Sequence, residues 1–356
     1  MNKKAFMLIE KLEKEHSLSL SEYKYLIENL SDDVISLLAE KAVEARKKVY
    51  KNHVYIRGLI EISNICKNDC YYCGIRRSNT DCDRYRLTLD EILSCCKEGY
   101  ELGFRTFVLQ GGEDKYFSDD VVCDIVSKIK ENHPDCAVTL SLGERSKESY
   151  QRLYDAGADR YLLRHETADE GLYSKLHPEE MRLQSRLECL KNLKEIGFQT
   201  GCGFMVGAPF QTASHIAKDL KFIEEFQPHM CGIGPFIPHK DTVFKDEKSG
   251  SAELTCYLLS IIRLICPNVL LPSTTALDTV DETGCEKGIL SGANVVMPNL
   301  SPENVRGKYN LYNNKKITGV QSAKDLEILK NRMKKIGFQV LCDRGDVIKI
   351  SDGKLS

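Results

Sequence analysis

Hydrophobic residues follow two different spacings, one before about residue 50 and another after it. In the first part, leucines such as Leu8, Leu12 and Leu26 recur at the three- and four-residue spacing of an amphipathic helix. Ser31 stands where a capping residue would start a further helical stretch. We therefore expect residues 1–52 to form a helical extension.

From residue 53 onwards, short runs of β-branched and apolar residues alternate with longer amphipathic stretches. The runs that are typical of strands are 55–62, 106–110, 137–142, 159–164, 199–206, 229–234, 268–272 and 294–297. The stretches with helical periodicity are about 88–102, 118–132, 146–156, 182–196, 212–226, 252–265 and 281–291. Strands that alternate with helices in this way indicate repeated right-handed βαβ units.

Closing these units on themselves gives a parallel (β/α)8 barrel of the TIM type, which we expect over residues 53–305. An open doubly wound sheet is the alternative, but it rarely carries this many regular repeats. Residues 306–356 contain a helical stretch at 323–335 and the short strand candidates FQVLCD and DVIKI. We expect them to form a small α/β tail against the outside or the base of the barrel.

Composition narrows the class of protein. The 356 residues carry a formal net charge of −2, which argues against a general nucleic-acid binder because such proteins usually have a basic excess. The most apolar stretch, 254–271, is interrupted by Arg263 and Pro267, so we expect no membrane span. The N-terminus lacks the apolar core of a signal peptide, and the 15 cysteines are an odd number. We expect a cytoplasmic protein without structural disulfides.

Three of the cysteines stand apart from the rest. Cys66, Cys70 and Cys73 form a C-x3-C-x2-C pattern directly after the first strand candidate, where barrel chemistry gathers. Iron–sulfur clusters are held by cysteine thiolates, usually four, so three would leave one iron open to a small molecule. A zinc site with Cys82 as the fourth ligand is the alternative, although zinc usually uses paired C-x2-C units. A redox-active C-x2-C pair is a weaker one.

Polar and glycine residues follow several other strand candidates. Gln110-Gly111-Gly112-Glu113 could bring backbone close to a ligand, with Glu113 accepting hydrogen bonds from an ammonium group, or could be a plain turn. Arg164 and Glu166 share one face of their strand and suit a carboxylate and ribose hydroxyls, unless they pair with each other.

The later strands add fewer candidates. Met205, between Gly203 and Gly207, could let adenine lie against the backbone. Thr274 and Thr275 are candidate substrate ligands, but they could equally cap a helix. His239 is more typical of a loop than of a catalyst.

The cysteine pattern, with Tyr72 before its last cysteine, resembles that of the radical S-adenosylmethionine superfamily. The resemblance implies that the three cysteines bind a 4Fe-4S cluster, that S-adenosylmethionine chelates its fourth iron, and that reduction yields a 5′-deoxyadenosyl radical. It also implies that the GGE element contacts the methionine amino group.

Longer strings resemble one family within this superfamily. VLQGGED, AGADRYLLRHETA, GIGPFIPHKDT and GANVVMPN are similar to the HydE family, maturases of the iron-iron hydrogenase. The resemblance implies substrate contacts by Thr139, Arg164, Thr274 and Thr275. The cofactor contacts expected together are Tyr72, Gln110, Gly111, Gly112, Glu113, Glu166, Arg186 and Met205. Some relatives have Ser at position 111 and an accessory cluster on C-terminal cysteines, whereas this chain has Gly111 and no such cysteines.

The function implied by the resemblance is radical chemistry on a small cysteine-derived iron carbonyl cyanide complex, during assembly of the hydrogenase diiron centre. The implied partners are other hydrogenase maturases and an electron donor of the ferredoxin or flavodoxin type. A biotin-synthase-like or methylornithine-synthase-like radical enzyme is the alternative within the superfamily. A zinc-stabilised binding protein is the alternative outside it.

Overall fold

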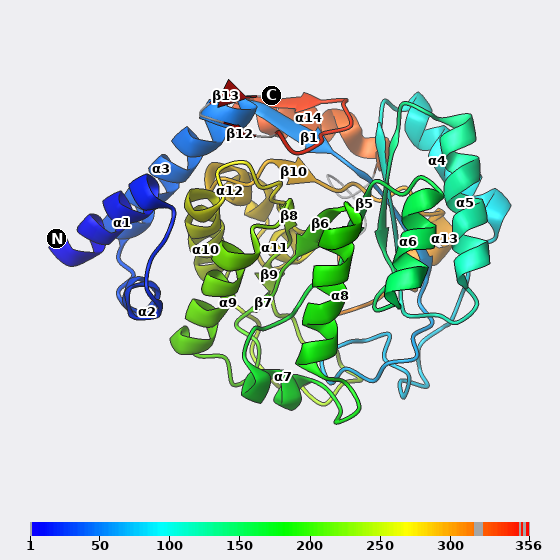
Figure 1. The fold of residues 1–356 in the computed structure, drawn as a ribbon, viewed down its shortest axis with the longest axis horizontal. Helices are drawn as coiled ribbons and strands as arrows, with labels where there is room; N and C mark the ends of the chain where they lie inside the picture. The colour runs from blue at the N-terminus through cyan, green and yellow to red at the C-terminus, as the bar shows by residue number, and fades with distance from the viewer. Residues whose placement is uncertain (1, 317–322, 349, 352–353, 356) are drawn as a thin grey trace.

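The computed structural model describes residues 2–316, 323–348, 350–351 and 354–355. A ring of parallel strands lies at its centre, and helices cover the outside of the ring (Figure 1). Six of the strands form one parallel sheet in the order β2-β3-β4-β5-β6-β8. They are β2 Gly58–Ser63, β3 Thr106–Gly111, β4 Ala137–Ser141, β5 Arg160–Leu162, β6 Gln199–Cys202 and β8 Met230–Cys231.

Shorter contacts carry the parallel pairing around the rest of the ring. Single bridges join Met230 to Leu270 and Pro272 to Val295, which lies in β10 (Val295–Val296). Strand β10 pairs with β1 (His53–Ile56), and Asn299 bridges to Leu59 in β2. The result is the expected α/β barrel, with the expected strand 268–272 reduced to single bridges. Pro272 lacks a backbone N–H, which limits the pairing of that segment.

Two further short strands extend the barrel at its carboxyl end, β7 (Met205–Val206) and β9 (Gly234–Pro235), which pair with each other. The expected strands 199–206 and 229–234 are therefore each split in two. Gly203 lies at one of the breaks with φ of +155°, and an added Cβ there would lie 2.0 Å from the Gly232 carbonyl oxygen. Close approach of the two backbones thus interrupts the strands just below the site.

The outer helices begin where polar caps precede amphipathic stretches. Thr88 and Glu91 form a reciprocal capping box at the start of α4, and Ser118 caps α5 in a similar way. Seven helices match the expected stretches: α4 Leu89–Glu101, α5 Asp119–Asn132, α6 Lys147–Asp155, α8 Leu183–Ile196, α9 Ala213–Phe226, α10 Ala252–Ile265 and α12 Gly284–Leu290. Three short helices were not expected: α7 Glu170–Leu176, α11 Thr275–Val280 and α13 Glu303–Arg306.

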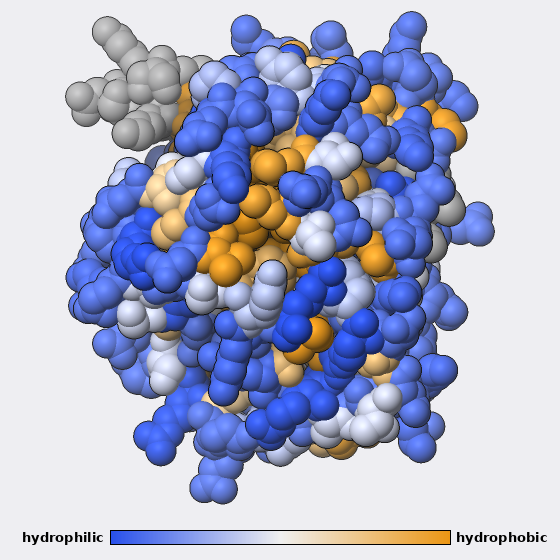
Figure 2. Space-filling model, turned by 90° about the vertical axis from the view of Figure 1, so that its right-hand side faces the viewer, coloured by the Kyte–Doolittle hydropathy of each residue, from blue (hydrophilic) through white to orange (hydrophobic). Residues whose placement is uncertain are grey.

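The N-terminal residues form three helices along one side of the barrel, α1 Lys3–Glu15, α2 Leu20–Glu28 and α3 Asp32–Tyr50 (Figure 1). Helix α2 packs on α9, where the Tyr23 hydroxyl donates to Glu224 Oε2 over 2.7 Å, and α3 packs on α10. None of the helices in the described ranges is long and apolar enough to cross a membrane. Figure 2 shows hydrophilic residues over most of another face, around a hollow in which hydrophobic residues gather.

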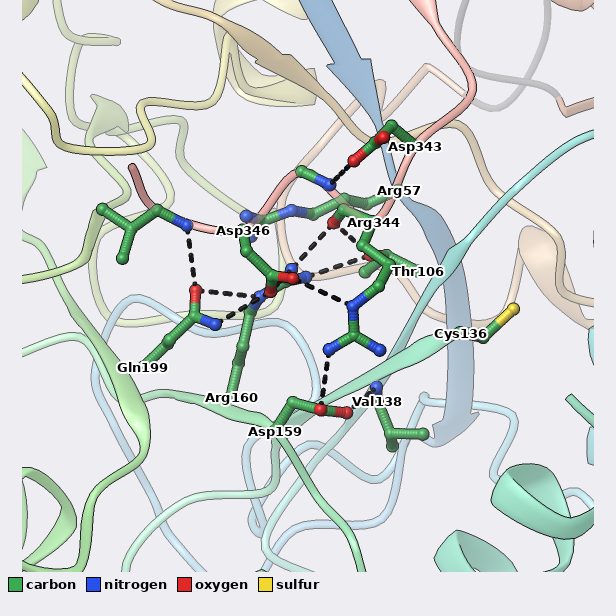
Figure 3. A network of polar contacts seen from close by, with 12 residues as sticks. Arg57, Thr106, Cys136, Val138, Asp159, Arg160, Gln199, Asp343, Arg344 and Asp346 are labelled. Atoms are coloured by element: carbon green, nitrogen blue, oxygen red, sulfur yellow. Dashed lines mark hydrogen bonds and ion pairs between the residues drawn. The ribbon is translucent and has the colours of Figure 1, made fainter. Parts of the chain in front are cut away.

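The C-terminal residues close the end of the barrel where the strands begin. After η2 (Ala323–Asp325) and α14 (Leu326–Lys335), β11 (Gln339–Leu341) pairs in parallel with β1. Asp346 then lies 2.5 Å from Arg160, the first residue of β5 (Figure 3). The expected strand FQVLCD thus appears as β11. Of DVIKI, only Ile350 belongs to a described strand, β12 (Ile350–Ser351), which pairs with β13 (Lys354–Leu355); residue 349 lies outside the described residues.

Candidate active site

A cavity of about 310 Å³ opens at the carboxyl ends of the barrel strands, at the far end from β11. It brings together all three cysteines of the motif, all eight expected cofactor contacts, and Arg164 and Thr274 from the expected substrate contacts. The other residues that line it are Asn68, Ile75, Ser141, Gly143, Leu162, Leu163, Gly234, Pro235, Phe236, Ile237, Ala276, Tyr309, Leu311 and Tyr312.

Two expected substrate contacts, Thr139 and Thr275, are not among the residues that line this cavity. Thr139 lies in β4, two residues before the lining residue Ser141, and its hydroxyl is buried with no hydrogen-bond partner among the described residues. Because side chains alternate along a strand, Thr139 points to the same side as Ser141 but lies deeper in the barrel. Thr275 is the first residue of α11, which Thr274 caps by accepting from the Leu277 amide.

The three cysteines lie on a long irregular segment after β2, which we call the cysteine loop (residues 64–86). A single guanidinium organises this loop. Arg84 donates to four backbone carbonyls, those of Asn64, Ile75, Arg76 and Asn79, over 2.6–3.0 Å. The sequence does not indicate this role of Arg84, because an arginine in a loop is not part of a periodic pattern.

The thiols of the three cysteines influence one another electrostatically. Burial raises the pKa of Cys66, and burial together with the neighbouring Cys66 thiol raises the pKa of Cys73 to about 12. The pKa of Cys70 lies well above its usual range because of burial and of both other thiols. A bound metal cluster would supply positive charge that stabilises such crowded thiols as thiolates.

This donor set fits an iron–sulfur cluster, for which cysteine thiolates are the usual ligands. Across the described ranges, no three His, Cys, Asp or Glu side chains are grouped closely enough to hold a single metal ion. The proposed fourth zinc ligand, Cys82, instead has its sulfur 3.6 Å from Asn64 Nδ2 and does not line the cavity.

The Gln110–Glu113 turn lies directly against the cysteine loop. The Gly112 amide donates to the Ser63 carbonyl, the Lys67 amide donates to the Glu113 carbonyl, and the Glu113 amide lies 3.4 Å from Cys66 Sγ. An added Cβ at Gly112 would lie 2.3 Å from the Ile65 carbonyl oxygen, so only glycine fits there. At Gly111 the nearest atoms would be 3.4 Å away, which leaves room for a side chain.

The Glu113 carboxylate marks one wall of the cavity. It lies 3.0 Å from Lys67 Nζ, and its side chain crosses Gly143, where an added Cβ would come within 2.0 Å of Glu113 Cγ. Glu113 also lines a second, outer cleft of about 230 Å³. The carboxylate therefore stands between the main cavity and this cleft, within reach of a cationic group in either.

Strand β5 leads to a pair of opposite charges in the cavity. Arg164 Nη2 lies 3.1 Å from Glu166 Oε2, but the geometry is not that of a hydrogen bond, and both atoms are without a hydrogen-bond partner among the described residues. The two residues thus pair, as the alternative interpretation of the sequence held, while keeping their hydrogen-bonding capacity for a ligand. Arg186 Nε donates to Glu144 Oε1 over 2.6 Å, and its Nη1 donates to the Arg164 carbonyl over 3.1 Å.

Tyr72 is held by a histidine that sequence reasoning missed. His177 Nδ1 lies 2.9 Å from the Tyr173 carbonyl and so carries the proton, which makes His177 Nε2 the acceptor for the Tyr72 hydroxyl at 3.1 Å. The Tyr173 ring stacks on His177 with centroids 3.9 Å apart. Burial lowers the pKa of His177 to about 3, so the ring is neutral. A histidine at the end of a short helix carries no sequence signal for this role.

A segment after α13, residues 307–316, covers the cavity, and we call it the roof segment. Its residues Tyr309, Leu311 and Tyr312 line the cavity, and the Leu311 carbonyl accepts from the Gly74 amide beside Cys73 over 2.8 Å. Lys315 forms a buried ion pair with Glu61 of β2. The C-terminal residues therefore contribute to both ends of the barrel, whereas we expected them only at its outside or base.

Known proteins with similar sequences are radical S-adenosylmethionine enzymes, in agreement with the cysteine motif at this site. The chain is 46% identical over 275 residues to the [FeFe] hydrogenase maturase subunit HydE of Thermotoga maritima, which covers 77% of this chain and 78% of the relative. The chain belongs to the HydE family. Residues 60–223 match the model of the radical SAM superfamily, and the matched range includes the cysteine loop and strands β3–β6.

Two more distant relatives share the fold of this HydE-family chain. The 3-methylornithine synthase of Methanosarcina acetivorans is 28% identical over 289 residues, 81% of each chain. The crystal structure of a methylornithine synthase superposes with a TM-score of 0.80 over 94% of this chain and 97% of the other, at 23% identity. The HydE-family chain is thus a radical S-adenosylmethionine enzyme, and its cofactors are a 4Fe-4S cluster and S-adenosylmethionine.

Proposed function

We propose that this enzyme acts in assembly of the diiron centre of an iron-iron hydrogenase, by radical chemistry on a small cysteine-derived iron carbonyl cyanide complex. The observation that supports this most strongly is the 46% identity to a hydrogenase maturase over 77% of the chain. The cavity adds the guanidinium of Arg164, whose Nε and Nη2 make no hydrogen bond among the described residues, in the same space as three thiols, which suits a substrate that carries a carboxylate.

In this proposal Cys66, Cys70 and Cys73 each ligate one iron of the cluster and leave the fourth iron for the cofactor. A cluster held by these cysteines would, when reduced, supply one electron for cleavage of S-adenosylmethionine to methionine and a 5′-deoxyadenosyl radical. Glu113 accepts hydrogen bonds from the methionine ammonium, and Glu166 accepts them from the ribose hydroxyls. The remaining proposed cofactor contacts are Tyr72, Gln110, Gly111, Gly112, Arg186 and Met205, all of which line the cavity.

The substrate side of the cavity is formed by Arg164 and Thr274. Arg164 can bind a carboxylate through two N–H groups, and the Thr274 hydroxyl can add a hydrogen bond. Thr139 and Thr275, which do not line the cavity, are also proposed substrate contacts. Thr139 suits this role because its buried hydroxyl has no hydrogen-bond partner among the described residues.

Exclusion of water is part of the proposed function, because a primary carbon radical must be kept from solvent. Tyr309 and Tyr312 of the roof segment cover the cavity, and Gln110 Nε2 lies 3.3 Å from the Tyr309 hydroxyl. The buried Glu61–Lys315 ion pair anchors the roof segment to β2. These contacts favour a closed site during turnover.

We also propose the division of the chain into a helical extension (1–52), the radical barrel (53–305) and a C-terminal tail (306–356). The partners proposed with it are other hydrogenase maturases and a ferredoxin- or flavodoxin-type electron donor. The bound substrate in this proposal is small, since a cavity of about 310 Å³ must hold it together with the cofactor.

The test combines metal content with maturation of a hydrogenase. Reconstituted anaerobically, the wild-type protein should hold about four irons and activate a hydrogenase in a mixture of maturases that lacks only this component. Cys70→Ala should lose most of the iron and all activation. Cys82→Ala is the matched control and should keep both, because Cys82 does not line the cavity. One zinc per chain, or loss of metal in Cys82→Ala, would support the zinc alternative instead.

A methylornithine-synthase-like activity is the second candidate, favoured by the shared fold and the 28% identity. Incubation of the reduced enzyme with lysine and S-adenosylmethionine separates the two. A rearranged amino acid formed from lysine, with no activation of the hydrogenase, would overturn the maturase proposal. The biotin-synthase-like alternative is tested in the same way with dethiobiotin.

A further inference from the structure

We propose that the buried residues His165 and Asp219 position Glu166. The pair holds the segment after β5 in the conformation that directs the Glu166 carboxylate into the cavity. The proposal rests on the cofactor role of Glu166 proposed above and goes beyond it. It assigns a function to His165 and Asp219, which belong neither to the C-x3-C-x2-C motif nor to the residues that line the cavity.

Glu166 has an unusual backbone conformation. Its φ is +65°, in the left-handed region that residues other than glycine rarely adopt. Such a conformation persists only where the surrounding structure imposes it, and it is concentrated at functional sites. The Glu166 amide donates to the Gly203 carbonyl over 3.0 Å, and its carbonyl accepts from the Met205 amide over 3.4 Å. These two hydrogen bonds join Glu166 to the segment that follows β6. The residues directly before and after Glu166 in the chain are held by other contacts.

His165 holds one flank. It is not among the residues that line the cavity, and it is completely buried against Phe204 and Phe222. The Gly203 amide donates to His165 Nδ1 over 3.3 Å, so the ring proton is on Nε2. That nitrogen lies 3.6 Å from Asp219 Oδ1.

Asp219 holds the other flank. It lies in α9, is fully buried, and accepts a hydrogen bond of 2.5 Å from the Ala168 amide. Burial raises the pKa of Asp219, while His165, Ala168 and Thr167 act against that shift. One carboxylate from α9 therefore contacts residues on both sides of Glu166.

The arrangement predicts a separation of two properties. Without the Asp219 carboxylate, the turn can relax towards an ordinary φ, and the Glu166 carboxylate then turns away from the cavity. The cysteine loop follows β2 and packs on the turn after β3, and within the described ranges no hydrogen bond joins it to α9; its Tyr71 amide instead donates to the Leu176 carbonyl of α7 over 3.0 Å. Loss of the pair should weaken binding of S-adenosylmethionine and leave the iron content unchanged.

The experiment measures binding of S-adenosylmethionine to the reconstituted, oxidised enzyme by equilibrium dialysis without a reductant, so that no turnover takes place. Asp219→Leu removes the oxygen that contacts both His165 and the Ala168 amide and should raise the dissociation constant about tenfold, with iron content as in wild type. His165→Phe keeps a ring between the two phenylalanines, loses both nitrogens, and should give a similar increase. It serves as the second variant if Asp219→Leu does not fold.

A double-mutant cycle shows whether the pair acts through Glu166. Glu166→Gln should weaken binding by itself, and Asp219→Leu should add less than about twofold in that background. Glu224→Gln is the matched control, because it removes a carboxylate from the same helix that bonds to Tyr23 on the far side. It should lower the melting temperature and leave the dissociation constant unchanged.

Three outcomes would overturn the proposal: an unchanged dissociation constant in the folded Asp219 and His165 variants, a full additional loss in the Glu166→Gln background, or an unchanged constant in Glu166→Gln itself. The proposed maturase function is judged separately, by iron content and hydrogenase activation of the wild type. A failure of the one is therefore distinguishable from a failure of the other.

Discussion

Arg164 Nη2 lies 3.1 Å from Glu166 Oε2, and both side chains line the cavity that the three cysteines share. The two residues are assigned to different ligands in the proposed mechanism, Arg164 to the substrate and Glu166 to the cofactor. Their contact therefore marks the border between the two binding regions. In this proposal, a substrate carboxylate that binds Arg164 replaces part of the attraction between Arg164 and Glu166. The Glu166 carboxylate is then freer to accept hydrogen bonds from the ribose hydroxyls.

Arg164→Ala should impair action on the substrate more than binding of the cofactor. A charge-assisted hydrogen bond contributes about 1.5–3 kcal/mol, so we expect substrate-dependent product formation to fall roughly 10- to 100-fold. The dissociation constant of S-adenosylmethionine should change less than about threefold. Product formation and equilibrium binding measure the two effects. Arg182→Ala, at an exposed position before α8, is the control and should change neither. Equal loss of both properties in Arg164→Ala would contradict the assignment.

The two glycines after β3 should respond differently to substitution. In Gly112→Ala the new Cβ meets the Ile65 carbonyl oxygen at 2.3 Å and Cys66 Cβ at 2.9 Å, so the cysteine loop must move. We expect the variant to hold clearly less iron after reconstitution and to lose cleavage of S-adenosylmethionine. Gly111→Ser is the matched control, with its nearest neighbours 3.4 Å away, and should keep a full iron content. Iron and sulfide analysis decides between the two, and equal iron in both variants would refute the close-contact argument.

His177 should make the stability of the protein depend on pH. Burial lowers the pKa of His177 to about 3, against about 6.5 in an unfolded chain. Below pH 6.5 the unfolded state therefore binds a proton that the folded state does not, and stability falls as pH falls from about 6.5 towards 3. Between pH 7 and 5.5 this amounts to about 1 kcal/mol.

The variant His177→Gln removes that contribution. Urea unfolding of the cluster-free protein at the two pH values should show about 1 kcal/mol less acid destabilisation in the variant than in wild type. The half-buried His215 of α9, which contacts Asp169 and Thr212, provides the control as His215→Gln. Identical pH dependence in wild type and His177→Gln would show that His177 titrates normally.

Two buried arginines at the base of the barrel should have opposite effects on stability. Arg57 is buried, and its Nε and Nη2 have no hydrogen-bond partner among the described residues, while Arg160 bonds to Asp346, Thr106 and the Arg344 carbonyl (Figure 3). Burial lowers the pKa of Arg57 far below its usual range. Arg57→Met should therefore raise the free energy of unfolding by about 1–3 kcal/mol, because it removes a poorly compensated buried charge.

Arg160→Met tests the contrast. It removes the hydrogen bonds of Arg160 to Thr106 and the Arg344 carbonyl as well as its ion pair with Asp346, which keeps Arg344 and Gln199 as partners, and should lower the free energy of unfolding by about 1–3 kcal/mol. Chemical denaturation of both variants gives the comparison. A loss of stability in Arg57→Met as large as in Arg160→Met would mean that Arg57, whose Nη1 donates to the Met230 sulfur over 2.9 Å, is as well compensated as Arg160.

Much of the fold was predictable because its elements are local. The outer helices match the periodic stretches closely, as α9 (Ala213–Phe226) shows against the expected 212–226, and caps such as Thr88 mark their starts. Short strands were less predictable. The segment 268–272 has the composition of a strand but is limited to bridges at Leu270 and Pro272, because the pairing depends on neighbours that are distant in the sequence.

The residues of the candidate site were also predictable only in part. Cys66, Cys70 and Cys73 could be recognised because three ligands within eight residues carry their chemistry in the local spacing. His177 and the pair His165–Asp219 could not, since they act through contacts with distant segments. Arg84 could not either, because its contacts within an irregular loop leave no periodic pattern. The position of the roof segment at the cavity was not predicted either, because Tyr309 and Lys315 occur in a stretch without periodicity.

The sequence by itself determined that the chain alternates strands and helices, and that a three-thiolate motif stands at the carboxyl end of the first strand. Both properties depend on residues near one another in the chain. Only the tertiary structure decided which side chains from distant parts of the chain meet: Lys315 with Glu61, and Asp219 with the turn that carries Glu166. Such contacts join residues up to hundreds of positions apart, and the packing of the whole ring sets them.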